Sequence, residues 1–302
     1  MLEWSTLASL SEWLGDIGGR GSANPAVERS LGVAYALLFV AGVVANFFLF
    51  QAYHRRPTER KRAENRLLWR PWSWLDAAHI TLFLTASLLI GSSLASGLDG
   101  IGWIDLEAHP ILLILIHSLS LHGAAILFVA ALMAQRRFSW VTCFAHRRWT
   151  WLGGFGGGLI AYIAIIPFLF TYAILYQLWL RTAGQEARLQ DAIHLFSELT
   201  DNSQRLVFIF VAVVLAPVSE ELLFRGIVLP ALGRIWGMGA AIALSSALFA
   251  LIHLHAPSLV PLFVLSIGLS LAYVYSKSLL VPISMHMVFN AVSLATVSIL
   301  PI

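Results

Sequence analysis

The stretch that decides the fold is residues 206–232, which read LVFIFVAVVLAPVSEELLFRGIVLPAL. Most of its side chains are apolar, and about twenty such residues in helical form cross the roughly 30 Å hydrocarbon layer of a membrane. Yet Glu220, Glu221 and Arg225 lie within it. Ionisable side chains at this depth cost at least about 3 kcal/mol each unless they are paired or hydrated. The stretch therefore predicts a membrane-spanning helix with a functional polar site.

The rest of the chain has the same apolar character. Of its 302 residues, 59% are hydrophobic and 12% are charged, whereas about a quarter of the residues of soluble domains are charged. We therefore expect an all-α fold, a polytopic bundle of about eight transmembrane helices. The apolar runs that are long enough to span lie at 31–52, 74–96, 110–134, 152–180, 206–232, 238–256, 259–276 and 279–300.

Basic residues indicate how these spans are threaded. Arg and Lys gather in segments 53–73 and 135–150, whereas segment 97–109 has neither. Because basic loops stay in the cytoplasm, we expect the first two segments to face the cytoplasm, together with Arg234 and Lys277. Both chain termini then lie on the opposite side of the cell membrane. Topology explains the basic loops, so the lipid bilayer is an expected partner and nucleic acid is not.

Three regions differ in their chemistry. Residues 1–30 have Leu and Trp at helical spacing, which predicts an amphipathic segment in the outer interface. Residues 31–200 form a four-span membrane region of unknown role. Residues 203–300 carry acidic, basic, His and Asn side chains at depth, and we expect the functional site there.

Histidine and cysteine residues also occur outside the last region, and we predict no catalytic role for them. His79, His117 and His122 lie on early spans, where a histidine most often forms a hydrogen bond with a neighbouring carbonyl group. His117 and His122 are five residues apart, about 140° around a helix, so they do not share a face. Cys143 is the one cysteine of the sequence, and the chain cannot build a disulfide or a thiolate metal cluster by itself.

The fifth span predicts two acids with different roles. Glu221 and Arg225 are four residues apart, so they share a helix face and can form the ion pair that makes burial of either charge tolerable. Glu220 points about 100° away and has no partner in its own helix, so either another helix satisfies it or it is a general base. Pro217 removes a backbone donor and kinks the helix, which opens space for water beside Glu220.

Spans six and eight each carry two further residues at helical spacing. Phe249 and His253 are four residues apart, as are His286 and Asn290, so each pair lies on one helix face. At 1.5 Å per residue from the cytoplasmic ends, the polar members of these pairs and Glu220 lie about 10 to 22 Å deep. We therefore expect these polar groups to meet in one layer of the membrane.

In combination and in this order, the motifs resemble those of the CPBP family. These are the CAAX-protease and bacteriocin-processing (ABI) membrane peptidases, which include the type II CAAX prenyl endopeptidases. The family pattern is Glu-Glu-x-x-x-Arg, then Phe-x-x-x-His, then His-x-x-x-Asn, and residues 203–300 contain each motif without departure. The first two hundred residues share no part of the resemblance. The matching positions are Glu220, Glu221, Arg225, Phe249, His253, His286 and Asn290.

The resemblance implies an intramembrane endopeptidase that hydrolyses peptide bonds in membrane-associated or lipidated protein substrates. Glu220 would act as general base on a water that His253 helps to hold. His286 and Asn290 would donate hydrogen bonds to the oxyanion, which contributes roughly 3–4 kcal/mol per donor in other hydrolases. The residues that would support the site are Glu221, Arg225 and Phe249.

The resemblance leaves the cofactor open. Family members are often called metalloproteases, and Glu220, His253 and His286 are the candidate ligands of a divalent metal such as zinc. The His-Glu-x-x-His signature of classical zinc peptidases is absent from the sequence. Activation of water by protein groups alone fits the same residues.

Two other classes of function also fit the sequence. A relative that no longer cuts would act as a membrane scaffold or as a regulator of a partner protein. A transporter or proton relay would use buried acids and histidines differently, but the inverted repeats typical of transporters are not found. The sequence also lacks the Gly-x-Ser-Gly loop of serine rhomboid proteases and the paired intramembrane Asp of aspartyl proteases.

Overall fold

The computed structural model describes residues 25–55, 57–68, 70, 72–106, 109–140, 144, 150–184 and 191–299. Every regular element within these ranges is helical. Six helices in this part of the chain are long and apolar enough to cross a membrane, and one of them runs over 50 residues from Asn202 to Leu251. A shorter apolar helix covers Leu280–Thr296. With the long segment divided at its kink, these helices correspond to the predicted spans, and the protein is a multi-pass helical membrane protein.

The helices follow one another along the chain as expected for such a bundle. The first part supplies α2 (Pro25–Arg55), α3 (Pro57–Leu68), α4 (Trp74–Gly100), α5 (Pro110–Ser118), α6 (Ala124–Gln135) and α8 (Trp151–Ala183). The second part supplies α9 (Asp191–Glu198), α10 (Asn202–Phe210), α11 (Ala216–Leu223), α12 (Leu229–Leu251), α13 (Leu259–Ser276) and α14 (Leu280–Ile299). Within the described residues, three π-helical segments interrupt the spans, namely η1 (Leu119–Gly123), η2 (Val211–Leu215) and η3 (Phe224–Val228).

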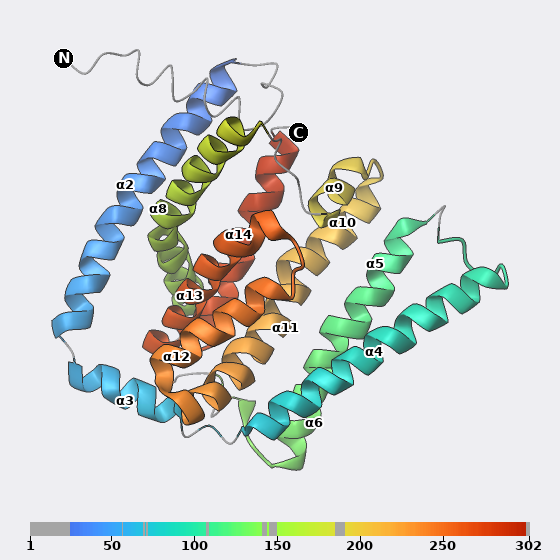
Figure 1. Ribbon diagram of the computed structural model, residues 1–302, viewed down its shortest axis with the longest axis horizontal. Helices are drawn as coiled ribbons and strands as arrows, with labels where there is room; N and C mark the ends of the chain where they lie inside the picture. Colours follow the sequence, from blue (N-terminus) through green and yellow to red (C-terminus); the bar gives the residue numbers. More distant parts are fainter. Residues whose placement is uncertain are drawn as a thin grey trace.

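Helices α11 to α14 form the centre of the bundle. Figure 1 shows α2 and α8 on one side of this group, and α4 with α5 and α6 on the other. Helix α8 packs against α14, α13 and α2, whereas α11 contacts α6 and η1. Glycine permits the close approach of α8 to α14, because a Cβ at Gly158 would lie 2.6 Å from the Cβ of Ser284. The four-span region thus flanks the C-terminal helices on both sides.

Helix α12 contains a reversal of the chain. Gly237 has φ 77° and ψ 162°, a backbone conformation that is essentially restricted to glycine. Ile235 and Trp236 are exposed next to it. The turn falls where the sequence predicts the boundary between spans five and six, so the 50-residue segment is two spans.

Four connections between spans meet at one end of the bundle. Arg234 donates hydrogen bonds of 2.8 Å to the carbonyl oxygens of Leu68 and Trp72. Trp72 stacks on Phe144 with the ring centres 6.1 Å apart, and the Phe144 carbonyl accepts a 2.8 Å hydrogen bond from the N–H of Leu279. The connections after the first, third, fifth and seventh spans therefore lie together, as the predicted threading requires.

Two segments near the N-terminus differ between the prediction and the structure. Segment 53–73 was predicted as a loop, but it contains the polar helix α3. Helix α2 begins at Pro25, so residues 25–30 of the predicted amphipathic segment 1–30 belong to the helix whose candidate membrane span starts at Gly32. The rest of that segment, residues 1–24, lies outside the described residues, as does Cys143.

The sixth span is shorter than predicted. Helix α12 ends at Leu251 instead of residue 256. The chain cannot continue as a helix because Leu254 adopts a left-handed conformation with φ 50°, and a 3-10 turn, Ala256–Ser258, follows it. His253 therefore lies in a turn and not within a helix.

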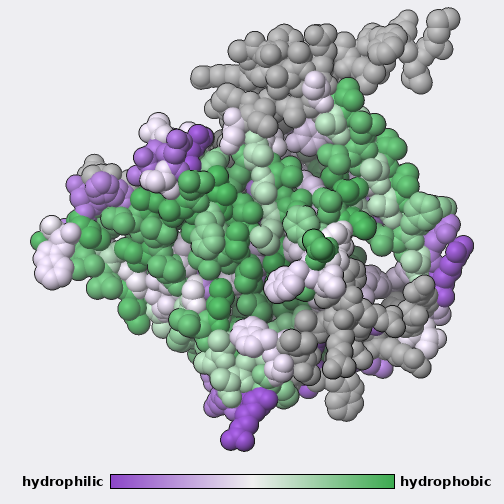
Figure 2. All heavy atoms as spheres, turned by 180° about the vertical axis from the view of Figure 1, so that it is seen from behind, coloured by the Kyte–Doolittle hydropathy of each residue, from purple (hydrophilic) through white to green (hydrophobic). Residues whose placement is uncertain are grey.

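The surface of the bundle suits a hydrocarbon environment. Apolar side chains cover most of the coloured surface in Figure 2, whereas hydrophilic residues gather toward its margins. Soluble monomers rarely expose apolar patches larger than a few hundred Å². Examples of large exposed side chains are Leu37, Phe47, Phe48, Phe50, Leu82, Leu89 and Leu127. Lipid, unlike water, solvates such side chains without penalty.

The threading can be tested with single cysteines in a Cys143→Ser background. We expect Arg62→Cys to resist an impermeant maleimide in intact cells and to react after permeabilisation, because segment 53–73 is basic. Trp103→Cys is the matched control, since Trp103 lies in the connection at the other end and is 78% exposed. It should react in intact cells. Labelling of Arg62→Cys from outside would reverse the predicted orientation.

Candidate active site

The candidate site is built around α11, a short α-helical segment between two π-helical segments. Segment η2 ends at Leu215 and η3 begins at Phe224, so eight residues of regular α-helix carry Glu220 and Glu221. Pro217 stands in the first turn of α11, where the sequence predicts an irregular helix. A π-helical turn holds an extra residue and is frequent at functional sites. The irregular backbone thus surrounds the two glutamates.

The ion pair between Glu221 and Arg225, predicted from their spacing, is present and buried. Arg225 Nη1 donates to Glu221 Oε1 over 3.0 Å, and the two side chains are 1% and 0% exposed. Arg225 Nη2 donates to the carbonyl oxygen and to the hydroxyl of Ser266 on α13, at 2.9 and 2.6 Å. The guanidinium also lies 4.9 Å from the ring centre of Phe249 on α12. The pair therefore ties α11 to α12 and α13 while it compensates both charges.

His286 on α14 connects the two glutamates. Its Nδ1 lies 2.9 Å from Glu221 Oε1, and this nitrogen is the donor because an ionised carboxylate can only accept. The other ring nitrogen, Nε2, lies 3.8 Å from Glu220 Oε2. Glu221 is fully buried, whereas the Glu220 side chain is 18% exposed. Another helix therefore supplies a partner to Glu220, and its carboxylate still keeps an accessible surface.

His253 lies in the turn after α12 and packs against the same aromatic ring as His286. Its Nδ1 donates to the carbonyl oxygen of Phe249 over 2.7 Å, which leaves Nε2 of the neutral ring as an acceptor. The Phe249 ring centre lies 4.9 Å from that of His253 and 5.8 Å from that of His286. The structure thus brings both predicted histidines to Phe249.

Asn290, one turn after His286, anchors α14 to η2. Its Nδ2 donates a 2.7 Å hydrogen bond to the carbonyl oxygen of Ala212. The usual backbone donors to this carbonyl are missing, because the Ala216 N–H donates to Val211 and Pro217 has no N–H. Asn290 thus satisfies a carbonyl group that Pro217 leaves without a donor. One hydrogen of the Asn290 amide remains for another acceptor.

His122 joins the site although the sequence assigns it no part there. The Nδ1 atom of His122, in η1, lies 2.7 Å from the hydroxyl oxygen of Ser219, the residue before Glu220. The imidazole also interacts electrostatically with Glu220, His253 and His286. The sequence predicts a hydrogen bond to a carbonyl group for His122, but its partner in the structure is a serine hydroxyl. No local pattern indicates its partner, because 97 residues separate the two.

The other two early histidines lie elsewhere. His117 forms a 2.9 Å hydrogen bond through Nε2 with the hydroxyl of Ser92, which links α5 to α4. His79 is exposed on α4. That these two histidines have no catalytic role stays a prediction.

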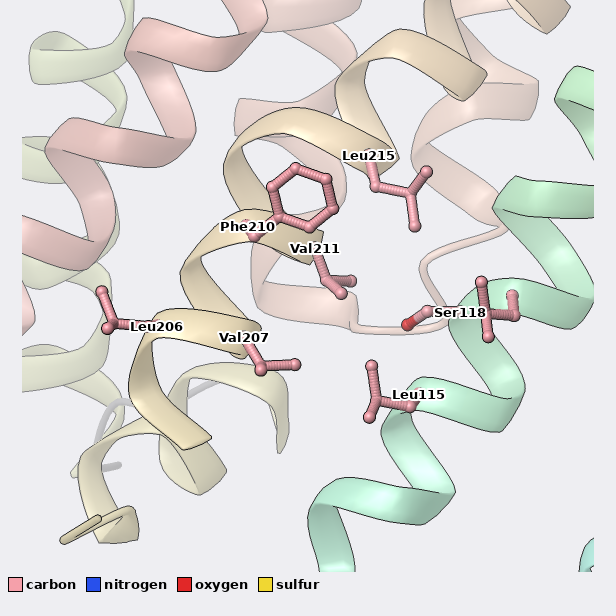
Figure 3. A pocket seen from close by; sticks show the side chains of 8 residues that line it. Leu115, Ser118, Leu206, Val207, Phe210, Val211 and Leu215 are labelled. Atoms are coloured by element: carbon pink, nitrogen blue, oxygen red, sulfur yellow. The ribbon is translucent and has the colours of Figure 1, made fainter. Parts of the chain in front are cut away.

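An apolar groove of about 400 Å³ lies between α5–η1 and α10–η2. Figure 3 shows its two walls, with Leu115 and Ser118 on one and Val207, Val211 and Leu215 on the other. The remaining lining residues are Leu119, Leu206 and Phe210, which are more than half exposed on the apolar surface. The groove is therefore accessible from the side that faces lipid.

The groove ends close to the glutamates. Ser118 precedes His122 by four residues, and Leu215 precedes Ser219 by four residues. The hydrogen bond between His122 and Ser219 therefore lies about one helical turn beyond the lining of the groove, and it connects the two walls there.

The candidate metal ligands do not form a metal site in this arrangement. No group of three His, Cys, Asp or Glu side chains in the described ranges is placed to hold a metal ion. His286 and His253 each commit Nδ1 to a protein acceptor, and Glu220 lies 3.8 Å from His286 Nε2. These contacts leave Nε2 of each histidine available as a ligand, as in many zinc sites, but the three side chains do not converge on one point as they stand. The chemistry proposed for the site therefore uses the side chains of the protein.

Comparisons with known proteins find relatives of the part of the chain that carries this site. The family described as type II CAAX prenyl endopeptidase Rce1-like matches residues 202–292. The membrane-embedded CAAX protease MroQ of Staphylococcus aureus (strain USA300) is 36% identical over 90 residues. Residues 202–292 resemble this family, and we call them the CAAX-protease segment after the family that they match. No solved structure matches the chain significantly.

The CAAX-protease segment covers part of each protein. The 90 aligned residues are 28% of this chain and 36% of the Staphylococcus aureus relative, so the chain matches about a third of that protein. The segment includes every motif position from Glu220 to Asn290. His122 and the four-span region lie outside it.

Replacement of Glu221 and replacement of Glu220 should have different effects on stability and activity. Glu221→Ala leaves Arg225 and His286 without their shared acceptor, and the loss of one partner of a buried pair typically costs about 3–5 kcal/mol. We expect a lower Tm and a lower yield, with activity lost alongside. Glu220→Gln keeps the shape but removes the base, so we expect a nearly unchanged Tm and a turnover at least ~100-fold lower.

The measurements are thermal unfolding in detergent and cleavage of a peptide that the wild type cuts. Each variant serves as the control for the other, because the two residues are adjacent. Near-normal turnover of Glu220→Gln, or equal loss of Tm in both variants, would make Glu220 a structural residue like its neighbour.

The metal question has a direct test. Because the three candidate ligands do not converge, we expect purified wild type to remain active with far less than one metal ion per chain by elemental analysis. His253→Ala and His286→Ala should leave the bound metal content unchanged. If the wild type holds one metal ion per chain and both variants lose it together with activity, zinc chemistry replaces the protein-only mechanism.

Proposed function

We propose that the protein is an intramembrane endopeptidase that hydrolyses peptide bonds in membrane-associated or lipidated protein substrates. The observation that carries the proposal is the position of Glu220, whose partly exposed carboxylate faces His286 Nε2. Its neighbour Glu221 is fully buried and accepts hydrogen bonds from Arg225 and His286. An accessible carboxylate beside a histidine, in a chain poor in charge, suits the removal of a proton from water.

A water molecule at Glu220 would find two acceptors. One hydrogen would bond to the Glu220 carboxylate and the other to His253 Nε2, because the Nδ1 hydrogen of His253 is committed to the Phe249 carbonyl. The water oxygen would then attack the carbonyl carbon of the peptide bond while Glu220 takes the proton. Glu220 would return this proton to the leaving amine when the C–N bond breaks. The roles implied by the family resemblance are thus chemically consistent with these hydrogen bonds.

The developing oxyanion would be stabilised from α14. Asn290 has one amide hydrogen left after its bond to Ala212, and His286 offers a second donor if Nε2 also carries a proton. A doubly protonated His286 together with Arg225 would balance the two carboxylates of Glu220 and Glu221. This role for His286 therefore agrees with the charges packed around it.

The apolar groove would give the substrate a route from lipid toward this site. Its volume of about 400 Å³ and its apolar lining suit a hydrocarbon chain or an apolar peptide segment. The names of the matched family and of the Staphylococcus aureus relative both refer to CAAX proteins. We therefore propose that the substrate class includes proteins with a lipid anchor near the bond that is cut.

The proposal is tested by proteolysis of a membrane proteome. Purified wild type and Glu220→Gln, each in detergent, are incubated with solubilised membranes, and new protein N-termini are mapped by mass spectrometry. We expect new termini in the wild-type sample that are absent with Glu220→Gln, because both proteins fold and one lacks the base. Identical sets of termini would reject the protease and favour a scaffold or transport role.

A further inference from the structure

Glu220 stands between two residues that are each held by a histidine from a different helix. On one side, Glu221 accepts a hydrogen bond from His286 on α14. On the other side, Ser219 bonds to His122 in η1 over 2.7 Å. The first of these contacts lies within the CAAX-protease segment. The second joins that segment to the four-span region, for which neither the motifs nor the comparisons provide a role.

The direction of the second contact follows from its partners. The Ser219 hydroxyl donates to the carbonyl oxygen of Ala216 over 2.9 Å, and a carbonyl can only accept. The hydroxyl hydrogen is thereby committed, so His122 Nδ1 must be the donor to Ser219. Ser219 is only 1% exposed, which leaves this hydroxyl no access to bulk water. His122 is therefore the donor that Ser219 requires.

The backbone around Glu220 needs such support from outside. Helix α11 is eight residues long and has π-helical segments at both ends, and Pro217 lacks a backbone donor. Regular helix hydrogen bonds therefore fix its orientation less completely than those of a long α-helix. Side-chain bonds to neighbouring helices therefore contribute to the direction of Glu220.

We infer that His122 is a positioning residue for Glu220, contributed to the site by the four-span region. Its bond to Ser219 fixes one side of α11, as the bond of His286 to Glu221 fixes the other. The titratable groups that interact electrostatically with the His122 ring are Glu220, His253 and His286. Glu221 and Arg225 lie next to these groups. The inference rests on the proposed peptidase function and extends it, because it makes the site incomplete without η1.

The contact also lies where a substrate from lipid would arrive. The hydrogen bond connects the two walls of the apolar groove about one helical turn beyond its lining. More precise positioning of the Glu220 carboxylate raises turnover more than substrate affinity, because the carboxylate acts on the attacking water and not on the bound substrate chain. The expected signature of losing His122 is therefore a lower kcat with little change in KM.

The test uses the full-length protein in vesicles of phosphatidylcholine and phosphatidylglycerol. The probe is a quenched fluorescent peptide that copies the strongest cleavage site mapped with the wild type. We expect His122→Ala and Ser219→Ala each to lower kcat by about tenfold, with KM within about threefold of wild type. The double variant should be no slower than the slower single variant, because both remove the same hydrogen bond. His122→Asn, whose amide nitrogen can replace Nδ1 as donor, should recover most of the lost kcat.

The matched control is His117→Ala, on the same span. His117 also bonds to a serine on another helix, at 2.9 Å, but away from the glutamates. Its replacement should lower Tm about as much as His122→Ala and leave kcat unchanged. If His122→Ala does not fold, Ser219→Ala and His122→Asn carry the same comparison.

Two results would overturn the inference and leave the proposed function standing, provided that Glu220→Gln abolishes cleavage. One is a kcat within about twofold of wild type for His122→Ala and Ser219→Ala. The other is an equal fall in kcat for His117→Ala, which would make His122 a general packing residue. A wild type that cuts nothing would overturn both.

Discussion

A single carboxylate oxygen, Glu221 Oε1, organises the centre of this protein. It accepts hydrogen bonds from Arg225 on the same helical stretch and from His286 on α14, and all three side chains are nearly or fully buried. Such charges are costly in a membrane protein unless they are paired, so the helices that bring the partners cannot move apart independently. Arg225 adds α13 through Ser266. The positions of α11, α13 and α14 therefore depend on this one buried group.

The same arrangement leaves Glu220 free for chemistry. Glu221 forms the buried hydrogen bonds that hold the helices together. Glu220 can therefore keep an accessible face, with its Oε2 3.8 Å from His286 Nε2. The irregular backbone near Glu220 lacks a helical hydrogen bond, and a side chain replaces that bond. Pro217 leaves the Ala212 carbonyl without its backbone donor, and Asn290 supplies one from α14. Residues that the family resemblance assigns to catalysis thus also hold the backbone that carries Glu220, the proposed base.

The four-span region encloses the CAAX-protease segment and contributes to it. Helix α8 packs closely on α14 through glycines, and η1 brings His122 to Ser219. The groove that leads from the lipid-facing surface has one wall from each region. A substrate from the membrane would therefore meet residues of both regions before it reached Glu220, which gives the four-span region a place in the proposed reaction.

Hydropathy, charge and helical spacing in the sequence were sufficient for the all-helical multi-pass fold, for most span boundaries and for the pair between Glu221 and Arg225. These features depend on neighbours within one or two helical turns, so local periodicity reveals them. The shortened sixth span was missed because one left-handed residue, Leu254, ends it. The contacts of His286 with Glu221, of Asn290 with Ala212 and of His122 with Ser219 join residues 65 to 97 positions apart. They depend on π-helical turns and on helix packing, which no local spacing encodes, so only the tertiary structure could decide which polar groups meet around Glu220.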